Sequence, residues 1–427
     1  MKIKHRALSY DKVLALPPEK HEKPLRPSRF VRALLRTLSA GELRDVGFTF
    51  DAEGMERLGK DQPALFLMNH SSFIDLKIAS VMLYPRPFNI ICTSDGFVGK
   101  KQLMRHLGCI PTRKFIPDVT LVKDMVVAVK ELGNSLLMYP EASYSFDGTA
   151  TPLPRSLGKL LKLLGIPVVM IKTSGAFLRD PLYNMLQVRK VPVSAHMRYV
   201  LSPEDIAQKS VEQLNEILRE LFTFDYFREQ QQNGIRVTEP FRADGLNRVL
   251  YKCPACLTEG QMEGKGIRLR CGCCGKTWEL TEQGVLKAEE GEDTFPHIPD
   301  WYAWERDCVR KEWEAGTYSL DIPVTIRMLV DSKCLYTVGE CRLTHTKEGL
   351  HLTGCDGKLD YLHKPALSYS LYSDYYWYEL GDMICIGNSK ALYYCFPKEG
   401  GDVVAKTRLA AEEYYRMRFP AKHEKDS

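Results

Sequence analysis

The sequence predicts an α/β protein in which a mostly parallel sheet is followed by a cysteine-rich segment and a small antiparallel β region with a C-terminal helix. Three observations support this fold class. Between residues 60 and 175, short apolar runs alternate with stretches of helical periodicity, which is typical of a parallel sheet with covered faces. Five of the 13 cysteines lie between residues 253 and 274. From residue 318 onward, short alternating segments are separated by turn signals.

Size and composition bound the number of domains. A chain of 427 residues is too long for one ordinary core, and 44% apolar with 26% charged residues is the composition of a folded protein. No apolar stretch reaches the roughly 18 residues that a spanning helix needs, and the N-terminus lacks the apolar core of a signal peptide. We therefore expect a cytoplasmic protein that does not span a membrane. The expected divisions are an N-terminal segment 1–47, an α/β domain 48–240, a cysteine-rich segment 241–290 and a β-rich domain 295–427.

The N-terminal segment is basic and amphipathic. Residues 1–50 contain 11 Lys and Arg against 5 Asp and Glu, whereas the whole chain has a net charge of only +5. From Arg29 to Leu38, apolar residues at positions 30, 31, 34, 35 and 38 fall on one side of a helix and the arginines largely on the other. The pattern fits a helix lying in an anionic membrane interface, and it fits equally a surface helix packed on its own domain. The proline-containing segment before it is expected to be an extended arm.

A strand-to-helix junction begins the α/β domain. The apolar run Ala64–Met68 predicts a buried strand, and Phe73–Leu83 predicts the helix that follows. Ser71 and Ser72 stand where a helix N-cap is expected, so we interpret them as caps, with oxyanion donation as the alternative.

His70 lies at this junction, and Asp75 follows five residues later. From about one turn into the helix, the carboxylate of Asp75 is expected to hold one imidazole nitrogen, which leaves the other free to act as a general base. The alternative is a capping histidine near an ordinary helix aspartate.

Further strands are predicted at residues 87–92, 108–113, 135–139 and 165–172. His70, Arg113, Glu141 and Lys172 each follow a predicted strand or lie at its end. Because ligands of such sheets bind outside the carboxyl ends of the strands, we expect one cleft to collect these four side chains.

Four segments in this order resemble the motifs of the glycerolipid acyltransferase family, which includes 1-acylglycerol-3-phosphate O-acyltransferases. They are Asn69–Asp75, similar to NHxSxxD, then Leu107–Arg113, Tyr139–Ser145, similar to FPEGTRS, and Gly165–Val169. The resemblance covers about residues 45–205.

The resemblance implies transfer of an acyl group from acyl-CoA or acyl-carrier protein to the hydroxyl of a lysophospholipid. The leading acceptor is 1-acylglycerol-3-phosphate, which would give phosphatidic acid. In this scheme His70 is the base, Asp75 orients it, and Arg113 binds the acceptor phosphate. Glu141, Ser143 and Lys172 are the other substrate-binding residues that it implies.

The third motif departs from the family pattern at two positions. Ala142 stands where the family usually has glycine, which matters only if the backbone there needs a positive φ. Tyr144 stands where the family has arginine, and this replacement removes a cation that would help to hold a phosphate. The cations available to compensate are Arg113, Arg155, Lys159 and Lys172.

The cysteine-rich segment contains two CxxC pairs, which predict a zinc ribbon. Cys253 and Cys256 form the first pair, and Cys271 and Cys274 form the second, with 14 residues between the pairs. Cysteines at this spacing suit a tetrahedral structural Zn²⁺ site, and the alternative is a disulfide pair or free thiols. Cys273 is an additional thiol. We expect no nucleic-acid partner, because the segment lacks a basic run interleaved with aromatic residues.

The C-terminal region is predicted to contain a helix at 297–313, strands at 322–330 and 350–352, a hairpin pairing 383–386 with 392–395, and a closing helix from Asp402 to Arg418. This order of elements is similar to a pleckstrin-homology or GRAM-type fold. The tyrosine-rich stretch Tyr369–Tyr378 is interpreted as a half-buried strand, with a lipid or partner surface as the alternative.

Two functional hypotheses follow. The first is an acyltransferase that is peripheral on the inner, anionic face of the membrane and uses lysophospholipid and acyl thioester substrates. The second is a non-catalytic, zinc-containing lipid-binding or adaptor protein built on an acyltransferase-like scaffold.

Overall fold

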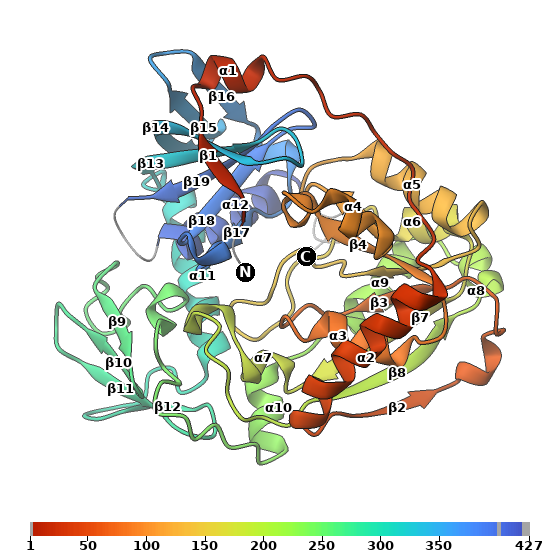
Figure 1. The fold of residues 1–427 in the computed structure, drawn as a ribbon. Coiled ribbons are helices and arrows are strands. Elements are labelled where there is room, and N and C mark those ends of the chain that lie inside the picture. The colour runs from red at the N-terminus through yellow and green to blue at the C-terminus, as the bar shows by residue number, and fades with distance from the viewer. Residues whose placement is uncertain (1–2, 399–402, 421–427) are drawn as a thin grey trace.

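The computed structural model describes residues 3–398 and 403–420. The chain forms a seven-stranded sheet, a four-stranded sheet and an eight-stranded sheet, joined by helices (Figure 1). In Figure 1 the seven-stranded sheet lies at the right, the four-stranded sheet at the lower left and the eight-stranded sheet at the upper left.

The seven-stranded sheet has the order β2-β8-β7-β3-β6-β4-β5. Its strands are β2 (Thr49–Glu53), β3 (Leu65–Met68), β4 (Phe88–Thr93), β5 (Cys109–Thr112), β6 (Ser135–Met138), β7 (Val168–Ser174) and β8 (Ser194–Leu201). All neighbouring pairs are parallel except β7 and β8. This confirms the predicted mostly parallel sheet, although the outer strands β2 and β8 were not predicted.

Helices cover both faces of this sheet because the central strand β3 is apolar on both sides. Leu65 and Leu67 pack into one core cluster, and Phe66 and Met68 pack into another. The first core contains residues of α5 (Val119–Lys130), α6 (Leu157–Leu164), α8 (Pro203–Gln208) and α9 (Val211–Leu221). The second core contains residues of α2 (Arg29–Asp45) and α3 (Asp75–Met82). The remaining helices of this part are α4 (Lys101–His106), α7 (Ala176–Arg179) and α10 (Tyr226–Gln232).

The four-stranded sheet is antiparallel, in the order β12-β11-β10-β9. Its strands are β9 (Met262–Lys265), β10 (Arg268–Cys271), β11 (Thr277–Leu280) and β12 (Leu286–Ala288). Trp278 of β11 is fully buried against Trp301 of α11 (Ile298–Ala315), with the ring centroids 5.0 Å apart. The ribbon-like sheet is therefore fixed to the long helix that leads into the C-terminal region.

The eight-stranded sheet is antiparallel apart from one strand contributed by the N-terminus. Its C-terminal strands are β13 (Leu320–Leu329), β14 (Leu335–Thr346), β15 (Gly349–Gly354), β16 (Leu359–His363), β17 (Tyr372–Asp374), β18 (Met383–Gly387) and β19 (Leu392–Pro397). The helix α12 (Val403–Arg418) follows, and the predicted start at Asp402 lies outside the described residues. The expected long strand over Tyr369–Tyr378 is wrong, because only β17 is extended and the chain then turns through a short 3-10 helix at Trp377–Glu379.

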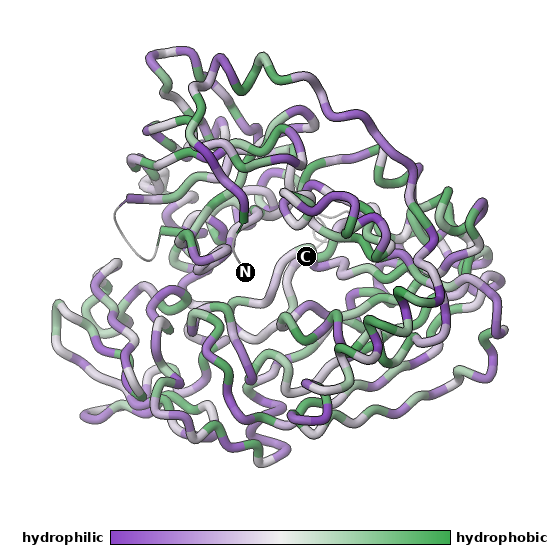
Figure 2. The backbone as a smooth tube through the Cα atoms, viewed as in Figure 1, coloured by the Kyte–Doolittle hydropathy of each residue, from purple (hydrophilic) through white to green (hydrophobic). Residues whose placement is uncertain are grey.

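The N-terminal segment connects the two larger sheets. The strand β1 (His5–Ala7) pairs in parallel with β14, and α1 (Tyr10–Leu14) follows it. From there a largely hydrophilic arm runs along the surface to α2 (Figures 1 and 2). The predicted arm and amphipathic helix are both present, whereas the pairing of residues 5–7 with a strand more than 300 residues away was not predicted.

Candidate active site

The carboxyl end of β3 passes directly into the His70 loop. Asn69 holds this end against β7, since its Oδ1 accepts from Thr173 N at 2.8 Å and its Nδ2 donates to Thr173 Oγ1 at 3.0 Å. The helix α3 begins at Asp75 with Ile74 as N-cap, so the interpretation of the two serines as helix caps is wrong. Instead, Ser71 Oγ bonds to the hydroxyl of Tyr226 at 2.5 Å, and Ser72 Oγ donates to Asp180.

The structure places His70 and Asp75 in direct contact. The distance between His70 Nδ1 and Asp75 Oδ2 is 3.1 Å, and this carboxylate oxygen also accepts from Ser71 N at 2.8 Å and Ser72 N at 3.1 Å. Asp75 is buried, whereas the His70 side chain remains 16% exposed and lines a cavity. With Nδ1–H donated to Asp75, the other ring nitrogen is the proton-accepting atom.

Glu141 fixes the backbone of His70 rather than a substrate. Its Oε2 accepts from His70 N at 3.0 Å, and its Oε1 accepts from Thr151 N at 2.9 Å. Glu141 is fully buried and does not line the cavity, whereas the family resemblance implies that it binds substrate. Burial raises the pKa of this carboxyl to about 7, against the opposing effect of the two amides.

Two tyrosines enclose the imidazole of His70. The ring centroid of Tyr139 lies 4.2 Å from that of His70, and the ring centroid of Tyr144 lies 3.9 Å away, both in stacked orientation. Burial lowers the pKa of His70 below its usual value, and the hydrogen bond and charge of Asp75 offset part of this effect. A histidine with a lowered pKa is neutral near pH 7, which is the protonation state that a general base needs.

Ala142 occupies a left-handed backbone conformation, with φ of 55°. The glycine of the family pattern would adopt this conformation without the Cβ clash that alanine suffers. Alanine at this position therefore introduces local strain beside Glu141. From the sequence we expected an effect of this replacement only if the backbone has a positive φ, and it does.

A cavity of about 1320 Å³ lies beside His70 and Asp75. One part of its wall is apolar and comes from the helices and strand ends of the seven-stranded sheet, including Met104, Leu121 and Leu160. Another part comes from the C-terminal region, between residues 366 and 379. Because ligand pockets are commonly about 300–1,000 Å³, the cavity is large enough for a substrate that carries an alkyl chain.

Four cations line this cavity, namely Arg113, Lys114, Arg155 and Lys159. Arg113 lies 3.8 Å from Asp118, and no ion pair within the described part of the chain involves the other three. Lys172 does not line the cavity, because β7 continues to Ser174 and the lysine lies within the strand rather than after it.

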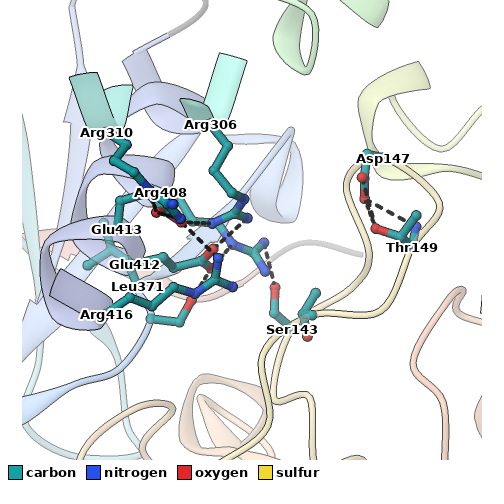
Figure 3. Close-up of polar contacts among 12 residues, drawn as sticks. Ser143, Asp147, Thr149, Arg306, Arg310, Leu371, Arg408, Glu412, Glu413 and Arg416 are labelled. Atoms are coloured by element: carbon teal, nitrogen blue, oxygen red, sulfur yellow. Dashed lines mark hydrogen bonds and ion pairs between the residues drawn. The ribbon is translucent and has the colours of Figure 1, made fainter. Parts of the chain in front are cut away.

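Ser143 is held by the C-terminal helix and does not line the cavity either. The guanidinium of Arg408, in α12, donates from Nη1 to Ser143 Oγ at 3.2 Å (Figure 3). The same guanidinium lies over the ring of Phe146, 4.4 Å from its centroid. Arg408 is buried, and its Nε contacts Glu412 at 3.1 Å, a carboxylate that also pairs with Arg306 of α11 at 2.8 Å. Glu413 completes the cluster through Arg306, Arg310 and Arg416 (Figure 3). A buried ion-pair network from α11 and α12 thus reaches the loop that carries Glu141.

The four predicted zinc ligands form a cluster. The Sγ atoms of Cys253, Cys256, Cys271 and Cys274 all lie within 4.8 Å of one another. Two of the distances, Cys253 to Cys274 at 3.8 Å and Cys256 to Cys271 at 3.7 Å, match the edge of about 3.8 Å expected for a tetrahedron with Zn–S bonds of about 2.3 Å. The site is therefore consistent with a structural zinc ion, and Cys273 lies outside the cluster.

The helix α2 presents an apolar stripe to solvent. Phe30, Leu34 and Leu38 are 74%, 45% and 68% exposed. Leu35 of the same helix lines the cavity. None of the helices in residues 3–398 and 403–420 is both long and apolar enough to cross a bilayer.

Part of the chain is similar to known proteins. Residues 49–174 match the family model described as Acyltransferase. Over 133 residues the chain is 27% identical to 1-acyl-sn-glycerol-3-phosphate acyltransferase, chloroplastic, from Arabidopsis thaliana, a match that spans 30% of this chain and 36% of the relative. The crystal structure of the 1-acyl-sn-glycerophosphate (LPA) acyltransferase PlsC from Thermotoga maritima is similar with a TM-score of 0.38 and 17% identity, over 49% of this chain and 82% of that one.

The chain therefore contains an acyltransferase domain similar to those of lysophosphatidic acid acyltransferases. A domain of this family acts on an acyl donor and an acceptor. The similarity to the curated relative spans about a third of that protein's length, and the family match ends at residue 174, before the C-terminal region that lines part of the cavity here.

Sequence reasoning missed several groups that surround His70. Lys114 directly follows Arg113 but was not singled out, and Tyr139 was assigned only to a strand end. The tyrosine-rich stretch was the one available signal for the C-terminal wall, and its alternative interpretation as a lipid or partner surface is the one that the cavity favours. No local signal pointed to Arg408, because its partner Ser143 lies 265 residues away.

Proposed function

We propose that this chain transfers an acyl group from an acyl thioester to the hydroxyl of a lysophospholipid, with 1-acylglycerol-3-phosphate as the simplest acceptor. The observation that carries the proposal is the contact of 3.1 Å between His70 and Asp75 at the edge of a cavity of about 1320 Å³ lined by apolar side chains and four cations. The acyl donor is either acyl-CoA or acyl-carrier protein.

The reaction follows from the position of the imidazole. The acceptor hydroxyl attacks the thioester carbonyl as its proton passes to the free nitrogen of His70, and Asp75 stabilises the imidazolium that forms. The tetrahedral intermediate then expels the thiolate, which takes this proton back from His70. The products are the new ester and the free thiol, and no covalent enzyme intermediate is needed. Arg113, Lys114, Arg155 and Lys159 supply positive charge for the phosphate of the acceptor.

The test is acyl transfer by the full chain with acyl-CoA or acyl-carrier protein and a panel of lysophospholipids. We expect His70→Ala to abolish product formation while the far-UV spectrum and the unfolding transition stay close to those of the wild type. His196→Ala is the matched control, since the side chain of His196, in β8, is 44% exposed and its ion pairs within the described residues are with Asp51 and Glu53 of the neighbouring strand β2. Wild-type turnover by His70→Ala would refute the proposal.

We propose a peripheral location on an anionic membrane surface for the same protein. The exposed Phe30, Leu34 and Leu38 would enter the interface, and the excess of basic residues in the N-terminal segment would be attracted to anionic lipids. Leu35, on the neighbouring side of α2, lines the cavity, so a lipid leaving the interface has a short path to His70. Co-sedimentation with vesicles containing phosphatidylglycerol tests this, and replacement of all three exposed residues by serine is expected to abolish it.

The second candidate function is a non-catalytic lipid-binding or adaptor protein. Its supporting observation is the stacking of Tyr144 on His70, which covers one face of the imidazole. The turnover assay decides between the two, because an adaptor would bind lysophospholipid without transferring an acyl group in any donor and acceptor combination.

A further inference from the structure

The C-terminal region contributes an aromatic and polar wall to the active-site cavity. We call residues 369–378 the tyrosine wall, because Tyr369, Tyr372, Tyr375, Tyr376, Trp377 and Tyr378 all line the cavity. The acyltransferase family match ends at residue 174, so this wall is a feature of this chain rather than of the matched segment. It lies close to the base, because the charge of its Asp374 acts on Tyr144, which is stacked on His70.

The backbone of the tyrosine wall is strained. Tyr376 and Tyr378 adopt φ of 52° and 48°, a left-handed conformation that is unfavourable for a non-glycine residue. Two contacts maintain it, since Tyr376 N donates to Asp382 Oδ1 and Trp377 N donates to Gly381 O, both at 2.9 Å. Such strain persists where the surrounding structure demands a particular side-chain placement, and here both tyrosines are placed into the cavity.

Asp374 offers an unused acceptor to the cavity. Asp374 is buried, with 7% of the residue exposed. Its Oδ1 accepts from Tyr375 N at 2.9 Å, and no described residue forms a hydrogen bond with its Oδ2. Lys114 lines the same space with its Nζ 4.2 Å from the ring centroid of Tyr372. The two charges interact, yet the two side chains form no ion pair. A donor and an acceptor therefore stand apart across a gap that a ligand can bridge.

The chemistry of this gap selects among ligands. Burial raises the pKa of Asp374 to about 7, and in its ionised form this carboxylate would repel a bare phosphate together with the neighbouring buried Asp95, whose Oδ2 accepts from Tyr372 and Tyr394. An ammonium group would be repelled by Lys114. A hydroxyl group satisfies both sides, because it donates to Asp374 and accepts from Lys114, while the C–H faces of a polyol pack on aromatic rings.

From this wall we infer that the acceptor is a lysophospholipid whose phosphate carries a polyol head group, such as glycerol or a sugar alcohol. The phosphate lies at the cationic part of the cavity, and the head-group hydroxyls lie against the tyrosine wall between Lys114 and Asp374. This inference rests on the proposed acyl transfer and specifies its acceptor.

The test compares three acceptors with the same acyl chain: 1-acylglycerol-3-phosphate, lysophosphatidylglycerol and lysophosphatidylethanolamine. For the wild type we expect the largest kcat/KM with lysophosphatidylglycerol. Asp374→Asn keeps the oxygen that binds Tyr375 N but replaces the cavity-facing acceptor with a donor, so we expect kcat/KM for lysophosphatidylglycerol to fall about tenfold or more. The value for 1-acylglycerol-3-phosphate should change by less than about twofold, because that acceptor does not reach the wall.

Two further variants make the result specific. Tyr376→Phe removes only the hydroxyl of a residue that lines the cavity and is expected to lower the same selectivity ratio without a change in folding, so it decides the question if Asp374→Asn is unstable. Asp356→Asn is the matched control, because Asp356 is exposed in the β15–β16 turn and its φ of 56° suits asparagine. It should leave the ratio unchanged.

The outcomes separate this inference from the proposed function. Turnover of no acceptor by the wild type would refute acyl transfer itself. Turnover of 1-acylglycerol-3-phosphate with no gain from a polyol head group, or a preference for the amine head group, would overturn only the acceptor assignment. An increase in the KM for the acyl donor, with unchanged acceptor selectivity in the variants, would also overturn it by assigning the wall to the donor.

Discussion

Replacement of Asp75 by asparagine separates the charge of this residue from its hydrogen bonds. Asp75 Oδ2 accepts from His70 Nδ1, Ser71 N and Ser72 N, whereas Oδ1 is buried without a hydrogen-bond partner among the described residues. An asparagine oxygen placed at the Oδ2 position keeps all three bonds, and the amide nitrogen then occupies the unbonded position. The variant therefore retains the orientation of His70 and loses the negative charge that stabilises the imidazolium.

The magnitude follows from that lost charge. A hydrogen bond to a charged group contributes about 1.5–3 kcal/mol, against about 1 kcal/mol for a neutral one, so we expect a loss of about 0.5–2 kcal/mol and a fall in kcat of roughly 2- to 30-fold. The Asp75 charge also raises the pKa of His70, and its removal should lower that pKa further. Since the neutral imidazole is the active form, the acid limb of the kcat/KM profile should shift to lower pH even as the maximal rate falls.

A steady-state pH profile of acyl transfer measures both effects at once. Asp356→Asn serves as the charge-matched control, because it removes an exposed carboxylate far from the His70 loop. An acid limb that stays in place, or moves to higher pH, would refute the assignment of Asp75 as the group that tunes His70. A loss of several thousandfold would instead indicate that the asparagine has turned its amide toward His70 and imposed the wrong tautomer.

Three further predictions concern the surroundings of the site. Ala142→Gly should raise the free energy of unfolding by up to about 1 kcal/mol, because glycine accepts φ of 55° without strain, and denaturant titration would show no gain if another residue determined this conformation. Arg408→Met should lower the free energy of unfolding by about 3–5 kcal/mol, because it leaves the buried Glu412 with Arg306 as its remaining ion-pair partner among the described residues. The arginines hold the pKa of Glu412 at about 2 against the effect of burial, and an unchanged thermal midpoint would contradict the prediction. Zinc removal by a chelator, or Cys256→Ser, should lower the thermal midpoint and loosen the contact of Trp278 with Trp301, which tryptophan fluorescence would detect. Metal analysis that finds no zinc in the purified protein would contradict the metal assignment.

The parts of this site that depend on residues close together in the chain could be predicted from the sequence. The apolar runs at 64–68, 87–92 and 135–139 predicted strands that correspond to β3, β4 and β6, and the spacing of His70 and Asp75 predicted their contact. The CxxC pairs predicted the cysteine cluster for the same reason, since each pair lies within a single turn. Short-range patterns of this kind follow from the geometry of one element and need no knowledge of the rest of the fold.

The groups that sequence reasoning misplaced depend on long-range packing. Glu141 was expected to contact a substrate or an arginine, but the turn after β6 brings it to the backbone amide of His70. Lys172 was expected at a strand end, but pairing with β8 extends β7 by two residues beyond it. Ser143 was expected at the substrate, but α12 binds it from the far end of the chain. In all three cases a partner distant in sequence determines where the polar side chain points.

Tyr144 is the position at which the third motif differs most from the family pattern, and its ring packs directly against His70. The arginine expected at this position would place a cation beside the base, and the tyrosine instead stacks on His70 at 3.9 Å and contacts Phe73 with ring centroids 5.4 Å apart. The third motif still has a buried guanidinium next to it, because Arg408 donates to Ser143 one residue away. Arg408 does not line the cavity, so it supports the loop and cannot reach a phosphate there. In the proposed reaction, Arg113, Lys114, Arg155 and Lys159 are therefore the cavity-lining cations available to bind the phosphate, and the tyrosine wall of the C-terminal region is proposed to recognise the rest of the acceptor. A truncation at residue 240 would therefore remove both the support of the Glu141 loop and one wall of the cavity, so the matched acyltransferase segment alone should be unable to perform the reaction of the full chain.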